Sequence, residues 1–350
     1  MAAPVTETHT SQTDDQLVDS LTGTPVPSPT AQLDEPTATP TILPTLTPTL
    51  TPSPTQTNTP TNTATPEPTP MGGSSQIAFA SIHAEIPQIW IMNVDGTGLM
   101  QITNMEEGAC QPDWSPDGTR LIFTSPCLDK QEEYPGSSLF IINVDGTGLT
   151  PLPTEPGGDY DPSWSPDGKQ IAFTSMRETK AQIHILNLDD LSVQTLASEG
   201  FKNIHPSFSF MGDQIIFISA RKGPFQVWFM GTDGSGQAAF SRSGELKNTY
   251  PVWTPDGQLV IFTQREVPLG VPNLVAVPVE SEGLDEYYLV DDLIPRRSAD
   301  VSPDGAWLLY ESWPDGVNHD IYVMTIGGEE ITQLTTDPAF DFDPVWRPVP

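Results

Sequence analysis

The stretch QPDWSPDGTRLIFTS at residues 111–125 returns as YDPSWSPDGKQIAFTS at residues 160–175. Weaker copies follow at residues 204–219, 249–264 and 297–312, and FDPVWRPVP ends the sequence. The successive spacings of 50, 44, 45, 48 and 45 separate the large residues of the copies, Trp114, Trp164, Phe208, Trp253, Val301 and Trp346. A fixed period of this length is the signature of a repeat architecture. The chain therefore contains six repeats.

Each repeat has the pattern of two β-hairpins. In the first hairpin, Pro116 presets φ, Asp117 can hydrogen-bond nearby backbone, and Gly118 supplies the positive φ that a tight turn needs. The flanking runs LIFTS and IAFTS are short, apolar and rich in β-branched and aromatic residues, which is typical of strands covered on both faces. A second Asp-Gly turn separates strand-like runs within residues 88–103 and 139–152. We predict that each repeat is a four-stranded antiparallel meander.

Such a sheet has two apolar faces and must stack on copies of itself, and radial stacking gives a β-propeller. The aromatic residue of each W-S-P-D-G segment is expected on the innermost strand, packed between neighbouring blades. The last repeat stops after its innermost strand, while three strand-like runs stand at residues 76–81, 88–93 and 99–103. These N-terminal strands are predicted to complete the C-terminal blade. The fold class is all-β, with residues 75–350 forming a six-bladed propeller of 46 residues per blade.

The repeat also resembles a known family. The pattern D-x-P-x-W-S-P-D-G-x-x-I-A-F-x-S, followed by I-x-x-M-N-x-D-G-x-G-x-x-x-L-T, is similar to the WD-like propeller repeat of TolB and its relatives. The resemblance covers residues 75–350, and the copies around Trp114 and Trp164 carry it almost letter for letter. It implies a binding or protein-interaction domain of the bacterial cell envelope, although related blades also occur in sensor proteins and beside peptidase domains.

Residues 1–70 have a different composition. From residue 24 to residue 70, Thr and Pro fill 29 of 47 positions, and such a segment cannot bury a core. We expect it to be disordered and extended, either as a stalk open to O-glycosylation or as a plain linker. The first 23 residues contain no Lys or Arg and no long apolar run, so the chain has no visible anchor of its own. The chain is then a piece of a longer protein with a signal, span or catalytic domain upstream, or its start is misassigned, or it is cytoplasmic. We expect one of the first two, with the propeller extracellular or in the cell envelope.

The formal net charge of −32, from 46 acidic and 14 basic residues, excludes nucleic-acid binding and adhesion to anionic lipid, because both need a positive surface. No G-x-S-x-G motif is present, which excludes the α/β-hydrolase peptidases that carry similar propellers. The five histidines stand in no metal-ligand spacing, and the Asp-Gly turns lack the ligand series of a calcium loop. We therefore expect no metal, no cofactor and no enzymatic activity.

Propeller geometry predicts where a binding site would lie. The residues just before each inner strand should encircle one mouth of the central channel, and they differ from copy to copy while the turn residues do not. The aligned positions are Gln111, Asp161, His205, Tyr250, Ser298 and Asp343, with Arg297 one step above. Convergent polar groups of this kind favour ligand binding, with Arg297 as an anion clamp. The alternative is that Asp161 and Asp343 only cap local backbone.

The two cysteines, Cys110 and Cys127, should flank the open end of one hairpin, where they either form a disulfide or remain free thiols. Three functions stay open for the whole chain. The leading one is a monomeric, non-enzymatic binding or sensor module that takes a protein, peptide, glycan or small ligand at the mouth. The second is a protein-interaction scaffold of the envelope, and the third is a hydrolase or lyase using Asp161, Asp343 and His205.

Overall fold

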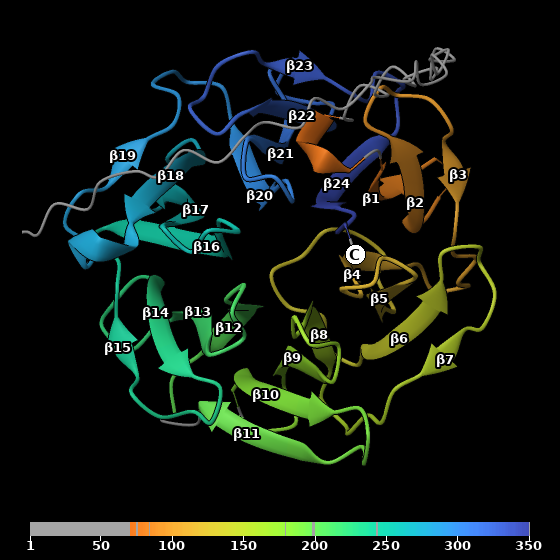
Figure 1. Ribbon diagram of the computed structural model, residues 1–350, viewed down its shortest axis with the longest axis horizontal. Helices are drawn as coiled ribbons and strands as arrows, with labels where there is room; N and C mark the ends of the chain where they lie inside the picture. Colours follow the sequence, from red (N-terminus) through yellow and green to blue (C-terminus); the bar gives the residue numbers. More distant parts are fainter. Residues whose placement is uncertain are drawn as a thin grey trace, which may run out of the picture. The chain divides into compact units, whose positions relative to one another are not determined.

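Antiparallel sheets of four strands make up the folded part of the chain in the computed structural model, which describes residues 71–74, 76–83, 85–178, 180–197, 200–242 and 244–349. Figure 1 shows six such sheets arranged as blades around a central opening. The predicted six-bladed all-β propeller is confirmed. The predicted stalk at residues 1–70 lies outside the described residues.

The blades are numbered here in chain order, each from its innermost strand outward. Blade 1 consists of β4 (Cys110–Trp114), β5 (Arg120–Ser125), β6 (Ser138–Asn143) and β7 (Thr150–Pro151). Blade 2 consists of β8 (Asp159–Trp164), β9 (Gln170–Ser175), β10 (Gln182–Asn187) and β11 (Val193–Ala197). Blade 3 consists of β12 (Asn203–Phe208), β13 (Gln214–Ser219), β14 (Gln226–Gly231) and β15 (Ala238–Ala239).

The other three blades follow the same plan. Blade 4 consists of β16 (Leu246–Trp253), β17 (Leu259–Glu266), β18 (Asn273–Pro278) and β19 (Tyr287–Tyr288). Blade 5 consists of β20 (Arg296–Val301), β21 (Trp307–Ser312), β22 (Asp320–Thr325) and β23 (Thr332–Gln333). Blade 6 consists of β24 (Phe340–Trp346), β1 (Gln76–Ile82), β2 (Gln88–Asn93) and β3 (Met100–Gln101). Two short 3-10 helices, η1 (Met71–Gly73) and η2 (Val279–Ser281), complete the described elements.

The ring closes as predicted, by joining the two ends of the chain in blade 6. β24 is the innermost strand of this blade and pairs antiparallel with β1, with Trp346 opposite Ile77 and Phe340 opposite Ile82 (Figure 1). Just before β1, Gly72 lies against the Trp346 indole with φ 72°, and an added Cβ would come within 2.7 Å of that ring. Only glycine fits this close approach without strain.

The hydrophobic core is divided into six clusters, one between each pair of adjacent blades. The aromatic residues that occupy the same position in successive repeats lie in different clusters. Trp114 lies between blades 6 and 1, Trp164 between blades 1 and 2, and Trp253 between blades 3 and 4. Burying one such indole removes roughly 200 Å² from water, or about 5 kcal/mol before costs. The predicted packing of these aromatics between blades is confirmed.

The outermost strands differ from the sequence prediction. Five of the six have only two residues, so the expected strand at residues 99–103 shortens to β3, and only β11 is longer. Their residues are exposed, as at Met100 and Tyr288, and Pro151 in β7 cannot donate a ladder hydrogen bond. Short edge strands present few unpaired backbone groups to other chains. None of the helices in the described residues has the length and apolar character of a membrane span.

Deleting residues 76–103 tests the closure. The deletion removes β1, β2 and β3 and exposes both β24 and the cluster that blade 6 shares with blade 1. We expect loss of the cooperative unfolding transition in calorimetry, because each blade depends on its two neighbours. Deleting residues 1–70 is the control and should leave the melting temperature within a few degrees. A cooperatively folded protein without residues 76–103 would contradict the ring.

Candidate functional site

The six positions predicted at the channel mouth share one backbone conformation. Each inner strand contains a β-bulge, and the bulged residues have φ between 51° and 54°: Gln111, Asp161, His205, Tyr250, Ser298 and Asp343. A left-handed conformation at a residue other than glycine costs of order 1 kcal/mol. All six line one cavity, so the structure brings them together as the alignment indicated. We call this end of the channel the mouth.

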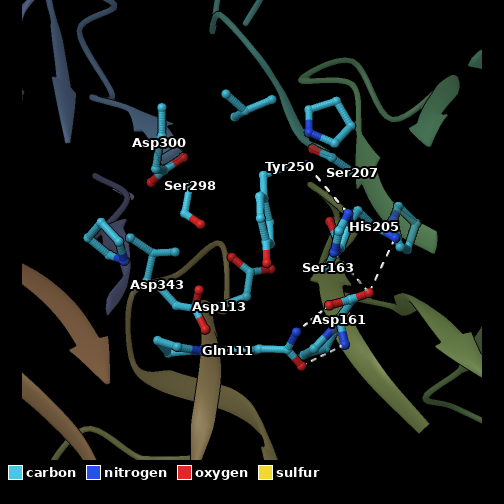
Figure 2. Close-up of a pocket in the computed structure, with 18 residues that line it drawn as sticks. Gln111, Asp113, Asp161, Ser163, His205, Ser207, Tyr250, Ser298, Asp300 and Asp343 are labelled. Carbon is cyan, nitrogen blue, oxygen red and sulfur yellow. Dashed lines mark hydrogen bonds and ion pairs between the residues drawn. The ribbon is translucent and has the colours of Figure 1, made fainter. Parts of the chain in front are cut away.

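The bulges direct backbone N–H groups toward the preceding blade, where side chains accept them. Gln111 Oε1 accepts the Asp161 N–H at 3.0 Å, and Asp161 Oδ2 accepts the His205 N–H at 3.3 Å. His205 Nδ1 accepts the Tyr250 N–H at 3.4 Å, and Thr263 Oγ1 accepts the Ser298 N–H at 3.1 Å. Figure 2 shows the part of this chain of contacts from Gln111 through Asp161 to His205. The mouth side chains therefore connect neighbouring blades.

Burial and nearby charges determine the protonation states of the side chains at the mouth. Burial, and then Lys202 and Lys130, lower the pKa of His205 well below its ordinary value, so the ring is neutral at neutral pH. Its Nδ1 accepts a hydrogen bond, and the proton therefore lies on Nε2, which has no partner and stands 3.7 Å from Asp161 Oδ2. Burial raises the pKa of Asp161 to about 7. Tyr250 stacks on His205 with ring centroids 4.2 Å apart.

A second layer of the channel lies two residues further along each inner strand. Here too, carboxylate side chains accept backbone N–H groups of the next blade. Asp113 accepts the backbone N–H groups of Trp114 at 2.9 Å and of Trp164 in the next blade at 2.7 Å. Asp300 accepts the Trp346 N–H at 2.7 Å. Burial raises the pKa of Asp113 and of Asp300 to about 7. Neither residue of this pair is among the predicted site residues, although each directly precedes the large residue of its repeat.

The cavity between these layers has a volume of about 170 Å³. Ligand pockets usually measure about 300–1,000 Å³, so this space suits a few water molecules or a small group rather than a drug-sized ligand. Figure 2 shows Asp161 and His205 on one side of it and Ser298, Asp300 and Asp343 on the other.

The mouth is covered by residues 126–137, which we call the plug loop. This loop joins β5 to β6 and has twelve residues, whereas the equivalent loops of the other blades have five to seven. In Figure 1 it reaches from blade 1 over the central opening. Its Lys130 Nζ donates to Ser298 Oγ and to Glu311 Oε2, each at 3.0 Å, and to Asp343 Oδ1. The unusual spacing of 50 residues between the first two repeats is the sequence signal that could have indicated this insertion.

Arg297 lies apart from the other predicted site residues. It does not line the channel cavity but donates to Glu311 Oε1 from Nε at 2.9 Å and from Nη2 at 2.6 Å, and it covers the Trp313 ring. Glu311 is fully buried and also contacts His319. Burial alone would raise the pKa of Glu311, but Lys130 and Arg297 outweigh it and hold that pKa well below its ordinary value. The guanidinium is therefore already paired inside the protein and does not face Asp161.

Cys110 and Cys127 form a disulfide. Cys110 directly precedes the mouth residue Gln111, and Cys127 begins the plug loop, so the bond attaches the loop to the inner strand of blade 1. At its other end the loop is held by Tyr134, which is 4% exposed and packs against Tyr160 of blade 2.

The opposite end of the channel, which we call the funnel, is lined mainly by aromatic residues and prolines. It has a volume of about 390 Å³, within the range of ligand pockets. The inner-strand aromatics and the prolines of the S-P-D-G turns line it, including Trp114, Trp164, Phe208, Pro255 and Trp346. Phe210 and Val349 at its rim are 61% and 55% exposed.

Comparison with known proteins agrees with the propeller fold. The family model of the TolB β-propeller domain matches residues 61–283. The chain belongs to this family. No curated protein matches it significantly in sequence.

Solved structures of the TolB fold resemble the chain at low identity. TolB from Acinetobacter baumannii is 18% identical with a TM-score of 0.68, over 79% of this chain and 67% of that chain. The putative TolB from Agrobacterium tumefaciens is 18% identical with a TM-score of 0.61, over 79% and 95%. An oligogalacturonate lyase in complex with manganese is 13% identical with a TM-score of 0.51, over 76% and 74%. At these identities the likeness concerns the fold alone, which the TolB proteins share with a lyase.

The residues of the hydrolase or lyase hypothesis are occupied by structural contacts. Asp161 and His205 each accept a backbone N–H of the next blade, and Asp343 pairs with Lys130. Among the described residues, no group of three His, Cys, Asp or Glu side chains is arranged to hold a metal ion.

Replacing Asp161 tests the structural role of the mouth. Asp161→Ala removes the acceptor of the Thr174 hydroxyl and of the Gln111 amide, and leaves the His205 N–H with Thr174 Oγ1 alone, at 3.2 Å. Each buried donor left unpaired costs about 1–3 kcal/mol, so the free energy of unfolding in urea should fall by at least about 1 kcal/mol. Asp189→Ala, at an exposed hairpin turn, is the control and should change it by less than about 0.5 kcal/mol. Equal stability of the two variants would contradict the inter-blade role of Asp161.

The channel carboxyls also predict how stability depends on pH. Asp113, Asp161 and Asp300 have folded-state pKa values of about 7, above the unfolded value near 4. The folded state then binds more protons than the unfolded state between these values, so stability falls as pH rises from about 5 to 8. Glu311 and His205 act oppositely: the contribution of Glu311 is lost only as pH falls below about 4, whereas the single His205 reduces stability below about pH 6.5 and is outweighed by the three carboxyls. Urea unfolding across this range should show a maximum near pH 5, and a flat profile between 5 and 8 would contradict the assignment.

Proposed function

We propose that the protein is a non-enzymatic binding module that takes an extended peptide segment of a partner protein into the funnel. The observation that carries the proposal is the difference between the two ends of the channel. The mouth is covered by the plug loop and leads to a cavity of about 170 Å³, whereas the funnel is lined by aromatic residues and prolines and measures about 390 Å³. Exposed apolar surface around a concavity is typical of an interaction site.

The charge around the funnel indicates the chemistry of the partner. The S-P-D-G turns place Asp117, Asp167 and Asp256 beside the funnel prolines, and hydrogen bonds from Ser115, Ser165 and Thr254 lower their pKa values. The outer hairpin turns lie at the same end of each blade and add further aspartates, among them Asp95 and Asp145. A peptide with apolar side chains flanked by Lys or Arg complements this surface.

The proposed setting is the cell envelope or the extracellular space, with the propeller acting as a monomer. The Cys110–Cys127 disulfide supports an oxidising compartment. The net charge of −32 supports a cationic protein segment rather than a nucleic acid. Membership of the TolB β-propeller domain family supports a protein partner. The mouth carboxyls are not proposed as catalysts, because their contacts hold the blades together.

A peptide panel tests the proposal. Three short peptides would share an apolar core and be flanked by Lys, Ser or Glu, and binding would be followed by tryptophan fluorescence, because Trp114, Trp164, Trp253 and Trp346 line the funnel. We expect the Lys-flanked peptide to bind best and to weaken as salt rises. Phe210→Ser should weaken it about tenfold, which is about 1.4 kcal/mol.

The control for Phe210→Ser is Leu269→Ser. Leu269 is 91% exposed and lies in the β17–β18 loop, at the mouth end of blade 4, so its loss should leave binding unchanged. Equal binding of all three peptides, or loss of binding in Leu269→Ser but not in Phe210→Ser, would overturn the proposal.

A further inference from the structure

The mouth surrounds one ammonium group completely. The three N–H bonds of Lys130 Nζ are matched by three acceptors, namely Ser298 Oγ, Glu311 Oε2 and Asp343 Oδ1. The Tyr250 and Phe342 rings flank the same nitrogen, with their centroids 5.0 and 5.3 Å away. A cation beside aromatic faces and away from water is bound strongly. The Lys130 side chain is accordingly only 4% exposed.

The walls of this ammonium site do not belong to the blade that supplies the lysine. Lys130 comes from the plug loop of blade 1, whereas Tyr250 belongs to blade 4, Ser298 and Glu311 to blade 5, and Asp343 to blade 6. Other contacts hold these walls: Ser298 N–H binds Thr263, and Glu311 binds Arg297 and His319. The site therefore has structural support that does not depend on its occupant.

One carboxylate oxygen of the site has no hydrogen-bond partner even with Lys130 in place. Asp343 Oδ2 is buried and has no hydrogen-bond partner. Glu311 is balanced by Arg297, so Asp343 depends on Lys130 for its nearest positive charge. A buried carboxylate strongly favours a cation beside it over an empty space.

The tip of the plug loop is held mainly by ion pairs. Glu132 pairs with Lys247 of blade 4, and Glu133 pairs with Lys202 beside blade 3 at 2.5 Å. Glu132 and Glu133 are 51% and 39% exposed, and Leu128 in the same stretch is 61% exposed. Each of these pairs has one well-exposed partner and weakens with salt, and the segment between Cys127 and Tyr134 belongs to no strand, so we infer that it can leave the mouth while the blades stay folded.

We propose that the mouth is a receptor site for a primary alkylammonium group, which Lys130 occupies in the free protein and an external amine occupies when the plug loop is displaced. The ligand is a lysine side chain of a partner or a free alkylamine, because both present three N–H donors on an unbranched carbon chain. This site is separate from the funnel and does not depend on the peptide proposal.

Chemical rescue of Lys130→Ala tests the receptor. The variant removes the ammonium and leaves the three acceptors and two rings in place. Adding n-butylammonium should raise its melting temperature in a saturable way, because a ligand that binds only the folded state stabilises it by mass action. Tetramethylammonium has no N–H and n-butanol has no charge, so neither should do so at equal concentration and ionic strength.

Lys169→Ala is the control, because it removes one lysine charge at an exposed turn at the funnel end and leaves the plug loop and Lys130 in place. It should respond to n-butylammonium no more than the wild type does. If Lys130→Ala folds only when refolded with n-butylammonium, the receptor is supported. An equal response of Lys130→Ala to n-butylammonium and tetramethylammonium, in melting temperature or in refolding yield, would overturn it.

A second measurement uses the wild-type protein. When n-butylammonium displaces Lys130, the loop tip becomes accessible, so a glutamate-specific endoproteinase should cleave after Glu132 and Glu133 several-fold faster. Cleavage after Glu280, at the funnel end of blade 4, should not change. Unchanged cleavage after Glu132 and Glu133 at amine concentrations that rescue Lys130→Ala would contradict the exchange.

The source of the ammonium is distinguished by a second ligand. Nα-acetyl-lysine amide presents the same side chain attached to a backbone. Rescue of Lys130→Ala by both compounds assigns the site to lysine side chains of a partner, whereas rescue by n-butylammonium alone assigns it to a free amine.

Discussion

The pairing of β24 with β1 is the constraint on which the rest of the structure depends. A blade has two apolar faces and no core of its own, so its stability comes from the clusters on either side. Without the last pairing, both the inner strand of blade 6 and its neighbours would face water. Closure also fixes the channel, because six inner strands can converge on one axis only when the ring is complete. Every contact described at the mouth and the funnel follows from this.

Apolar packing between blades is not directional, so it does not by itself fix how neighbouring blades are aligned. The hydrogen bonds of the two channel layers supply this alignment. At four of the six bulges the left-handed residue costs conformational energy but turns an N–H toward an acceptor of the preceding blade, as at Asp161 and His205. The same residues that would make a polar binding site thus serve as directional contacts between apolar surfaces. This dual possibility explains why polar residues at a propeller mouth are weak evidence for catalysis.

The two ends of the channel differ in the residues that line them. At the mouth, charges converge: Lys130, Glu311, Arg297 and Asp343 are largely buried and pair with one another. At the funnel, aromatic residues and prolines line the wall, and Asp117, Asp167 and Asp256 lie on the hairpin turns beside it. The low dielectric of a buried site strengthens an ammonium interaction, whereas we propose a longer and less specific partner for the larger aromatic funnel.

The sequence by itself determined the repeat, the blade, the ring closure and the ring of mouth positions, because turn chemistry and strand patterning are local and recur six times. It also brought Cys110 near Cys127, since both flank one hairpin. Only the tertiary structure decided what the mouth residues contact. Lys130 meets Glu311 and Asp343 across 181 and 213 residues, and Arg297 turns to Glu311 rather than to the channel. Each of these pairings occurs once in the chain, so the repeat pattern could not predict it. The pairings of Lys130 also depend on the path that the plug loop takes across the closed ring.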